Sequence, residues 1–295
     1  MSETTKTGII EKRLIFYLIS ILLIVASLFF IFSFKFEKSI DFYGGAQIEI
    51  LIKGNLNVLD FKNKFEKFGL KEVLNVEGER YILKFNQMSE EEHQKFLEEL
   101  KKYYDFTEES FTNVSSLVGK ELRKKTFSAI LIVLILISLY ITFAFRKKVK
   151  PISSFIFGLA TLIALFHDVL ISLGFVAFNR FSFDINIVVA ILTLAGFSVH
   201  DTIVVFDRIR ENIALGNKKN INLKEIINFS IKQTMARSIN TSLTTILALI
   251  VSYFIFGYYV KSLILTLIFG IVIGTYSSIF IASPLVYEFY KNKLK

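Results

Sequence analysis

Ionisable side chains interrupt three long apolar stretches of this sequence. His167 and Asp168 lie in one stretch, His200 and Asp201 lie in the next, and Arg237 stands near the start of a third. A charged side chain at membrane depth costs about 2.5 to 3.5 kcal/mol on insertion scales, so such residues normally face other protein groups. Each of these residues is therefore a candidate for holding or moving a proton.

Asp201 and Arg237 form the first candidate pair. Asp201 lies about five helical residues from the centre of its stretch, and Arg237 and Asn240 begin the following stretch from the same end. Asp201 could take up and release a proton as its contact with Arg237 changes, because a nearby opposite charge alters proton affinity. The alternative, which the sequence supports equally, is a permanent ion pair that holds two helices together.

Four other side chains are secondary candidates. Asp168, with His167, could serve in a polar relay or form a hydrogen bond between helices. His200 points about 100° around its helix from Asp201, so we do not expect a dyad, and a hydrogen bond to a neighbouring helix is the favoured interpretation. Thr241 belongs to the polar start of its stretch, which suits interhelical hydrogen bonds or a wet path.

Membrane-spanning helices must position these side chains. The chain has 295 residues, of which 53% are hydrophobic, and a helix needs about 20 apolar residues to cross a bilayer core of about 30 Å. The sequence therefore predicts a polytopic α-helical membrane protein with six transmembrane helices. The six stretches are Leu14–Phe34, Thr126–Phe145, Ile152–Phe178, Ile185–Phe206, Asn240–Val260 and Ser262–Val286.

Six spans place both termini on one side of the membrane. Lysine and arginine gather on that side, before the first span, after the second, between the fourth and fifth, and after the sixth. The positive-inside rule makes this side cytoplasmic. Membrane topology thus explains the net charge of +9, and nucleic acid is not an expected partner.

The spans divide the chain into segments with expected boundaries. No small-residue cleavage pattern follows the first span, so we interpret it as a retained helix rather than a signal peptide. The expected segments are a cytoplasmic N-terminus (1–13), helix one (14–34), an extracytoplasmic domain (35–125), helices two to six (126–286) with a cytoplasmic loop (207–237), and a cytoplasmic C-terminus (287–295).

The expected extracytoplasmic domain has the pattern of a small α+β fold. Ser89 and Glu92 have the spacing of a capping box at the start of a helix that continues to Tyr104. The order β-α-β-β-α-β predicts a ferredoxin-like domain. The strand-like runs are Ala46–Ile52, Leu70–Val76, Arg80–Phe85 and Asp105–Thr112, and the first helical stretch is Val58–Phe68.

Two further patterns concern packing. Asn222–Met235 has apolar residues at rough helical spacing, which indicates either a helix along the membrane surface or a loop helix packed on the bundle. Gly270, Gly274 and Ser278 have small-xxx-small spacing, which permits close contact between helices.

The sequence shows no machinery for enzymatic chemistry. It contains no Gly-rich phosphate loop, zinc-ligand set or nucleophile elbow. Cysteine is absent, which excludes disulfides and thiolate metal sites. We therefore expect a protein that is not an enzyme and that needs neither a cofactor nor a metal.

Several segments resemble the SecD/SecF family of protein-export membrane proteins. The sequence departs from the family pattern at Phe197, where tyrosine is common, and at His200, where asparagine is usual. The segments are residues 197–212, which include Asp201, Asp207 and Arg208; residues 236–245, which include Arg237 and Asn240; Asp41-Phe42-Tyr43-Gly44-Gly45; Val118-Gly119-Lys120-Glu121-Leu122; and Ala164-Leu165-Phe166-His167-Asp168.

The resemblance implies one half of a resistance-nodulation-division transporter architecture, with SecD as the other half and a proton route between them. It assigns the proton pathway to Asp201 and Arg237, with Asn240 beside them. It places the chain in the bacterial cytoplasmic (inner) membrane beside the SecYEG channel, with SecA and YajC as further candidate partners. There the proton motive force would promote late steps of translocation, and the extracytoplasmic domain would hold the unfolded exported polypeptide.

Three alternatives stay open from the sequence. A half-transporter for lipids or small solutes shares the architecture, although the expected external domain is small for a substrate tunnel. A non-transporting scaffold of the translocation channel would use Asp201 and Arg237 as a static pair. Sodium could replace the proton, because a carboxylate with nearby hydroxyls can serve either ion.

Overall fold

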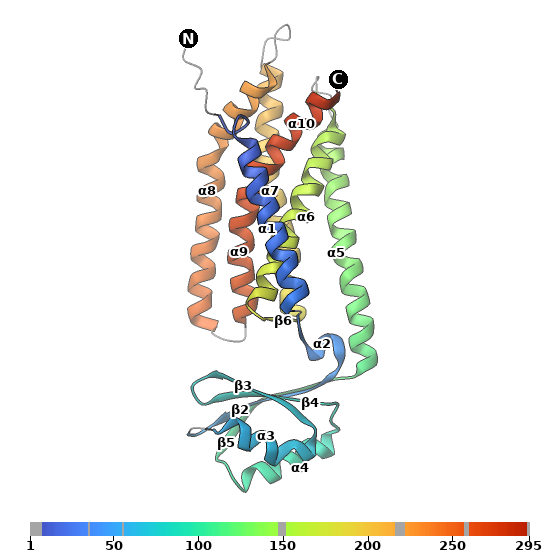
Figure 1. Cartoon of the computed structure of the whole chain (residues 1–295), viewed down its shortest axis with the longest axis vertical. Coiled ribbons are helices and arrows are strands. Elements are labelled where there is room, and N and C mark those ends of the chain that lie inside the picture. Colours follow the sequence, from blue (N-terminus) through green and yellow to red (C-terminus); the bar gives the residue numbers. More distant parts are fainter. Residues whose placement is uncertain are drawn as a thin grey trace. The chain divides into compact units, whose positions relative to one another are not determined.

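The computed structural model describes residues 8–34, 36–54, 56–146, 152–215, 222–256 and 260–293. The chain divides into two compact units, whose elements are labelled in Figure 1. The helical unit comprises Met1–Phe36, Ala129–Phe181 and Asn186–Lys295, and the inserted domain comprises Glu37–Ser128 and Ser182–Ile185.

Six helices among the described residues are long and apolar enough to cross a membrane, as the sequence predicted. Five of them are longer than the predicted spans, α1 by a single residue and the others by several, because polar helical residues continue the apolar segments. The helices are α1 (Arg13–Phe34), α5 (Ser116–Ala144), α6 (Ser154–Phe178), α7 (Ile185–Leu215), α8 (Leu223–Phe256) and a sixth made of α9 (Lys261–Ser277), the π-helical turn η3 (Ser278–Ala282) and α10 (Ser283–Lys293).

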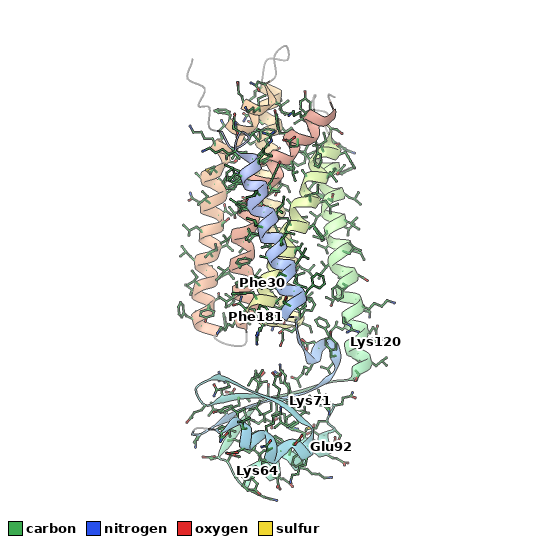
Figure 2. The ribbon with its side chains drawn as sticks, viewed as in Figure 1. Phe30, Lys64, Lys71, Glu92, Lys120 and Phe181 are labelled. Atoms are coloured by element: carbon green, nitrogen blue, oxygen red, sulfur yellow. The ribbon has the colours of Figure 1, made fainter. Side chains whose placement is uncertain are left out.

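The helices α6, α7 and α9 form the centre of the helical unit. Most residues in their apolar parts are buried, whereas few residues of α1, α5 and α8 are buried. Side chains project outward along these outer helices (Figure 2), and many of the exposed ones are large and apolar. A bilayer or a second polypeptide must cover this apolar surface.

Small residues bring neighbouring helices close together. A Cβ atom added to Gly174 of α6 would lie 2.3 Å from Ser27 Cβ on α1. On α9, a Cβ atom added to Gly270 would lie 2.6 Å from a methyl carbon of Leu194 on α7, and Gly274 faces Ser198 of the same helix. The prediction that the small-xxx-small spacing marks a close helix contact is confirmed.

The helix α8 is continuous, so the prediction of a separate surface helix at Asn222–Met235 is wrong. No glycine or proline interrupts α8, and one helix runs through both the amphipathic and the apolar part. The first part packs on the bundle: Ile227 and Ile231 are fully buried, and Asn212 of α7 donates a hydrogen bond to Ser230 Oγ at 2.8 Å.

At one end of the helical unit, the segment before α1 is tied to α8, and the start of α1 is tied to α10. Glu11 accepts hydrogen bonds from Lys224 Nζ at 3.0 Å and from Asn228 Nδ2 at 2.9 Å, and Arg13 forms an ion pair with Glu288. Burial raises the pKa of Glu11, but the hydrogen bonds outweigh burial, and its pKa lies below the usual value. The beginning and the end of the described chain therefore lie at the same end of this unit (Figure 1).

The inserted domain has the predicted β-α-β-β-α-β order. Its strands form one antiparallel sheet in the order β3-β4-β2-β5, which confirms the ferredoxin-like prediction. The elements are β2 (Gly45–Ile52), α3 (Val58–Phe65) with a 3₁₀ turn η1 (Glu66–Phe68), β3 (Leu70–Glu77), β4 (Arg80–Phe85), α4 (Glu90–Lys101) and β5 (Phe106–Val114).

The core of this domain lies between the sheet and the helices α3 and α4, which cover one face of the sheet (Figure 1). Alternate residues of β2 point into the core, as the period of a strand requires. Phenylalanines of both helices meet them there. These buried residues include Ala46, Ile48, Ile50 and Ile52 from β2, Phe61 and Phe65 from α3, and Phe96 and Leu100 from α4.

Two short strands and one short helix complete the domain. β1 (Glu37–Lys38) pairs in parallel with β6 (Ser182–Phe183), which belongs to the connection between α6 and α7. α2 (Ile40–Tyr43) follows β1, and Ser39 caps it by accepting a hydrogen bond from Asp41 N at 3.1 Å. The segment after α1 and the loop before α7 are thus joined within one unit.

Replacing Ser89 with alanine should loosen the first turn of α4, where Glu92 lies (Figure 2). Ser89 Oγ accepts a hydrogen bond from Glu92 N at 3.3 Å, and Glu92 accepts one from Ser89 N at 2.7 Å. Loss of such a cap costs about 0.5 to 2 kcal/mol, which would appear as several-fold faster amide hydrogen exchange at the start of α4. Glu91→Ala, in the same turn, is the control and should exchange like the wild type.

The same capping box predicts a pH dependence. Hydrogen bonds from Ser89 lower the pKa of Glu92. A carboxyl pKa that is lowered on folding adds stability above the unfolded pKa, and this contribution is lost as the pH falls through the folded pKa. The stability difference between the wild type and Glu92→Gln should therefore be constant above about pH 5 and shrink as the pH falls below the usual glutamate pKa of about 4.3, and an undiminished difference in strong acid would contradict this.

Gly174→Ala should separate α1 from α6, because the added Cβ would also lie 2.6 Å from the Ser27 backbone. Overpacking of this kind costs about 1 to 3 kcal/mol, so the detergent-solubilised chain should melt at a lower temperature. The control is Gly196→Ala on α7, whose added Cβ meets nothing within 4 Å. That variant should be as stable as the wild type or more so, because alanine favours a helix.

Candidate functional site

Asp201 lies on the buried side of α7. Its side chain is only 4% exposed, and it stands about 24 Å along the helix from Ile185. Ser238 of α8 and Ser278 of η3 lie beside its carboxylate. Nevertheless, Asp201 Oδ2 and Ser238 Oγ form no hydrogen bond with any described residue. Burying a carboxylate oxygen without a hydrogen-bond partner costs free energy. A proton bound to this oxygen would reduce that cost, so Asp201 is able to take one up.

Arg237, Asn240 and Thr241 lie on α8. Arg237 and Asn240 are exposed, and Thr241 Oγ1 donates to the backbone oxygen of Arg237 at 2.8 Å. No ion pair joins Arg237 to Asp201 in the described part of the chain, so the expected contact is not present here. Ser238, which stands between Arg237 and Asn240 on α8, lies beside the Asp201 carboxylate, so this part of α8 is level with Asp201 on α7.

His200 is exposed on α7 and does not form a dyad with Asp201, as its position around the helix predicted. The favoured hydrogen bond from His200 to a neighbouring helix is not found among the described residues. The imidazole of His200 therefore lies on the outer surface of a span, where it would contact lipid or another protein.

His167 and Asp168 are brought together with hydroxyl groups that the sequence analysis did not single out. His167 Nδ1 lies 2.8 Å from Asp168 Oδ1, and Asp168 Oδ2 accepts hydrogen bonds from Ser198 Oγ and Ser277 Oγ at 2.6 and 2.7 Å. His167 Nε2 lies 3.0 Å from Ser20 Oγ. Nowhere in the described residues do three His, Cys, Asp or Glu side chains gather as metal ligands would.

Asp207 and Arg208 anchor the far end of α7. Asp207 forms an ion pair with Arg210, and Arg208 pairs with Glu211 at 2.6 Å. Arg208 Nε also donates to Gln233 Oε1 of α8 at 2.7 Å. These charges connect two helices at their polar ends.

Asp41, Gly44 and Gly45 hold α2 in the inserted domain. Asp41 Oδ2 accepts a hydrogen bond from Ile185 N at 3.2 Å. Gly44 has φ +79°, and a Cβ atom there would lie 2.7 Å from Ser116 Cα at the start of α5. A Cβ atom on Gly45 would lie 2.9 Å from Phe85 O. The motif therefore requires glycine for backbone packing.

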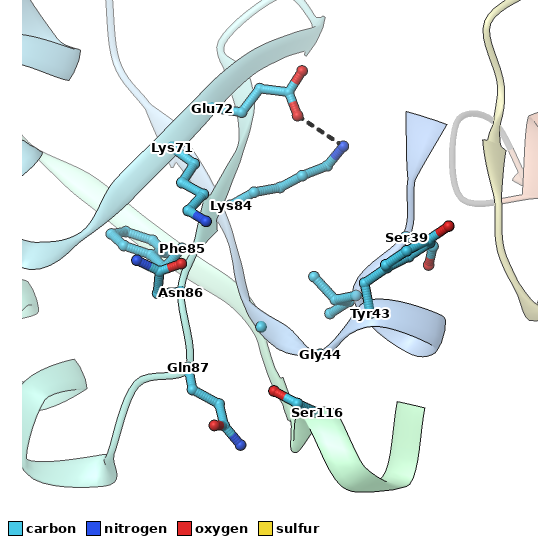
Figure 3. Close-up of a pocket in the computed structure, with 12 residues that line it drawn as sticks. Ser39, Tyr43, Gly44, Lys71, Glu72, Lys84, Phe85, Asn86, Gln87 and Ser116 are labelled. Atoms are coloured by element: carbon cyan, nitrogen blue, oxygen red, sulfur yellow. Dashed lines mark ion pairs between the residues drawn. The ribbon is translucent and has the colours of Figure 1, made fainter. Parts of the chain in front are cut away.

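A cavity of about 580 Å³ opens beside this motif within the inserted domain (Figure 3). An ion pair between Lys84 Nζ and Glu72, 3.0 Å apart, lies on its wall. The cavity is lined by polar and apolar groups alike, and it lies in the domain rather than among the buried groups of the spans. Its lining residues are Ser39, Ile40, Tyr43, Gly44, Gly45, Lys71, Glu72, Lys84, Phe85, Asn86, Gln87 and Ser116.

The fold and the buried polar groups define a class, namely multi-pass α-helical membrane proteins with a ferredoxin-like domain inserted after the first span. A family model described as "Protein export membrane protein SecD/SecF, C-terminal" matches residues 93–292. The chain belongs to the SecD/SecF family of protein-export membrane proteins, and it is an accessory subunit of a protein translocase.

Two curated relatives carry the description "Protein translocase subunit SecF". The protein of Thermobaculum terrenum is 36% identical over 304 residues, which cover 97% of this chain and 94% of the relative. The protein of Rickettsia conorii is 36% identical over 286 residues, which cover 94% of this chain and 90% of the relative. The similarity thus extends over nearly the whole length of each protein.

Two solved structures of SecDF have the same fold. The structure from Thermus thermophilus, described as a translocon-associated membrane protein, matches with a TM-score of 0.85 and 31% identity over 98% of this chain. A SecDF structure in a super-membrane-facing form matches with a TM-score of 0.69 and 27% identity over the whole chain. This chain spans only 39% and 40% of those two chains.

Gly44→Ala should destabilise the inserted domain and its junction with α5. The substitution combines a positive φ with a backbone contact of 2.7 Å to Ser116, and strain of this kind costs roughly 1 to 3 kcal/mol before the clash is counted. Gly78→Ala is the matched control, because Gly78 has φ +58° but open space around its Cβ position. Amide hydrogen exchange in α2 and β2 should be much faster in Gly44→Ala than in Gly78→Ala.

Proposed function

We propose that this chain uses the proton motive force to promote late steps of protein translocation through the SecYEG channel. In this proposal it works as one six-helix half of a SecD/SecF unit in the bacterial inner membrane, with both termini in the cytoplasm. SecD supplies the other half, and SecA and YajC are further partners. The chain itself carries no covalent catalysis.

One observation carries the proposal: a buried carboxylate and an exposed polar helix face lie at the same depth. Asp201 is buried with an unsatisfied oxygen, while Arg237 and Asn240 are exposed on α8. Polar side chains inside a span normally face protein or a water-filled cavity rather than lipid. A second polypeptide against α8 would cover them, which fits a half that needs a complement.

Movement between the halves would supply the coupling. If Arg237 approaches Asp201 in one arrangement and leaves it in another, the proton affinity of Asp201 differs between the two arrangements. One charge that crosses the membrane potential supplies about 2.3 kcal/mol per 100 mV. A few protons per cycle would therefore drive a substantial rearrangement, and the inserted domain would hold the exported polypeptide meanwhile.

Translocation into vesicles tests this function. The vesicles carry SecYEG, SecD and either the wild-type chain or Asp201→Asn, and SecA and a labelled unfolded precursor are added with or without an imposed proton gradient. We expect the gradient to accelerate late translocation with the wild type, and we expect Asp201→Asn to run at the rate seen without a gradient. Glu225→Gln, an exposed carboxylate on α8 outside the apolar part, is the control and should respond like the wild type.

Two results would contradict the proposal. An equal response of the wild type and Asp201→Asn to the gradient would make Asp201 a structural group. Acceleration by a sodium gradient in place of the proton gradient would assign the coupling ion to sodium. Loss of SecD binding in Arg237→Ala, measured by co-purification, would in turn support the proposal that SecD covers this face of α8.

A further inference from the structure

Four helices meet at the pair of His167 and Asp168, away from the exposed face of α8. Asp168 is fully buried and His167 is 4% exposed. Ser20 of α1, Ser198 of α7 and Ser277 of α9 contact the pair directly. Asp168 forms no ion pair with a lysine or arginine in the described part of the chain, and His167 is its charge partner.

With His167 neutral, every donor in this cluster has an acceptor. Two serine hydroxyls donate to Asp168 Oδ2, and His167 Nδ1–H donates to Asp168 Oδ1 at 2.8 Å. Ser20 Oγ–H then donates to His167 Nε2 at 3.0 Å. The hydroxyl of Tyr276 donates to the backbone oxygen of Phe16 at 2.9 Å. The cluster is complete without any further group.

The same cluster can accept one more proton without losing a hydrogen bond. A proton added to His167 Nε2 forms an N–H bond that donates to Ser20 Oγ. The Ser20 hydroxyl then rotates and donates to the Tyr276 hydroxyl oxygen, 3.3 Å away. The new positive charge of the imidazolium lies against the Asp168 carboxylate, so the loaded pair has no net charge in a medium where an isolated charge is costly.

Hydroxyl groups also connect this pair with Asp201. Ser198, which donates to Asp168, lies one turn before Asp201 on α7, and Ser278 Oγ approaches Ser198 O at 3.4 Å and lies beside Asp201. Thr202 Oγ1 contacts Ser278 Oγ at 2.9 Å. Both serines of α9 and η3 stand where the π-helical turn begins, and such turns occur frequently at functional sites.

We propose that His167 and Asp168 form a second proton-binding site that is complete within this chain, with Ser20 as the hydroxyl that reorients when the proton binds. Among the described residues, Tyr276, whose ring lies 6.4 Å from the His167 ring, is the other titratable side chain found against the pair. Ser198 and Ser277 are positioning residues, because they fix the carboxylate from α7 and α9. Only the passage of this proton to or from Asp201 depends on the function proposed above; binding of the proton by the pair does not.

Nitrogen NMR of the full chain in lipid nanodiscs tests the site without the translocon. The chain has three histidines, and the signals of His167 are those lost in His167→Gln. We expect His167 to change from one protonated nitrogen to two as the pH is lowered from about 8 to about 5. One protonated nitrogen at every pH in this range would overturn the proposal.

Two variants and one control test the reorienting hydroxyl. Ser20→Ala leaves the Nε2–H without an acceptor, so the ratio of doubly to singly protonated His167 at a given pH should fall about tenfold. Tyr276→Phe removes the acceptor of the rotated hydroxyl, keeps the ring, and should act in the same direction. Ser172→Ala, which removes a buried hydroxyl of α6 that has no hydrogen-bond partner among the described residues, should leave the ratio unchanged. Unchanged ratios in both test variants would overturn the role of Ser20.

The two proposals fail in different ways. A flat His167 signal together with a proton-gradient response in vesicles would remove only the second site. A titrating His167 together with an Asp201→Asn variant that still responds to the gradient would remove only the coupling role of Asp201.

Discussion

The central constraint on this structure is that polar groups inside a membrane span must find partners within the protein. Asp168 lies near the middle of α6, and its two carboxylate oxygens are satisfied by an imidazole and two serine hydroxyls from three different helices. Water is not available there to replace a missing partner. The rotation of α7 and α9 about their axes must therefore bring Ser198 and Ser277 to the carboxylate, and the small residues Gly270 and Gly274 let the backbones approach closely enough.

The inserted domain could be predicted from the sequence because its signals are local. Alternating apolar residues in β2, the capping box at Ser89 and the turn between β3 and β4 each depend on a few neighbouring residues. The length of α8 could not be predicted in the same way. Asn222–Met235 is amphipathic and is followed by an apolar segment, and these two patterns suggest two helices even though no residue between them breaks the helix.

The buried groups were predicted only in part, for a different physical reason. Asp201 and Asp168 stand out because charge is rare in apolar stretches, and both are buried. The groups beside these carboxylates are mostly serines, which are common in spans, and their presence in the sequence does not tell which way they point. Which of them contacts a carboxylate depends on how several helices are rotated, and a single sequence contains no measure of that rotation. The same limitation explains why Arg237, expected beside Asp201, lies on the exposed side of α8.

The π-helical turn between α9 and α10 has a geometric consequence for the end of the chain. A π turn accommodates one residue more than an α-helical turn, and one residue corresponds to about 100° around the helix. The turn therefore acts as a phase shift: α10 presents a different side to its neighbours from the side that an uninterrupted α9 would present. In this phase, Glu288 forms its ion pair with Arg13 of α1. The rotation of the last helix about its axis, and with it the contact of Glu288 with the first helix, is thus set six to ten residues before Glu288, at Ser278–Ala282.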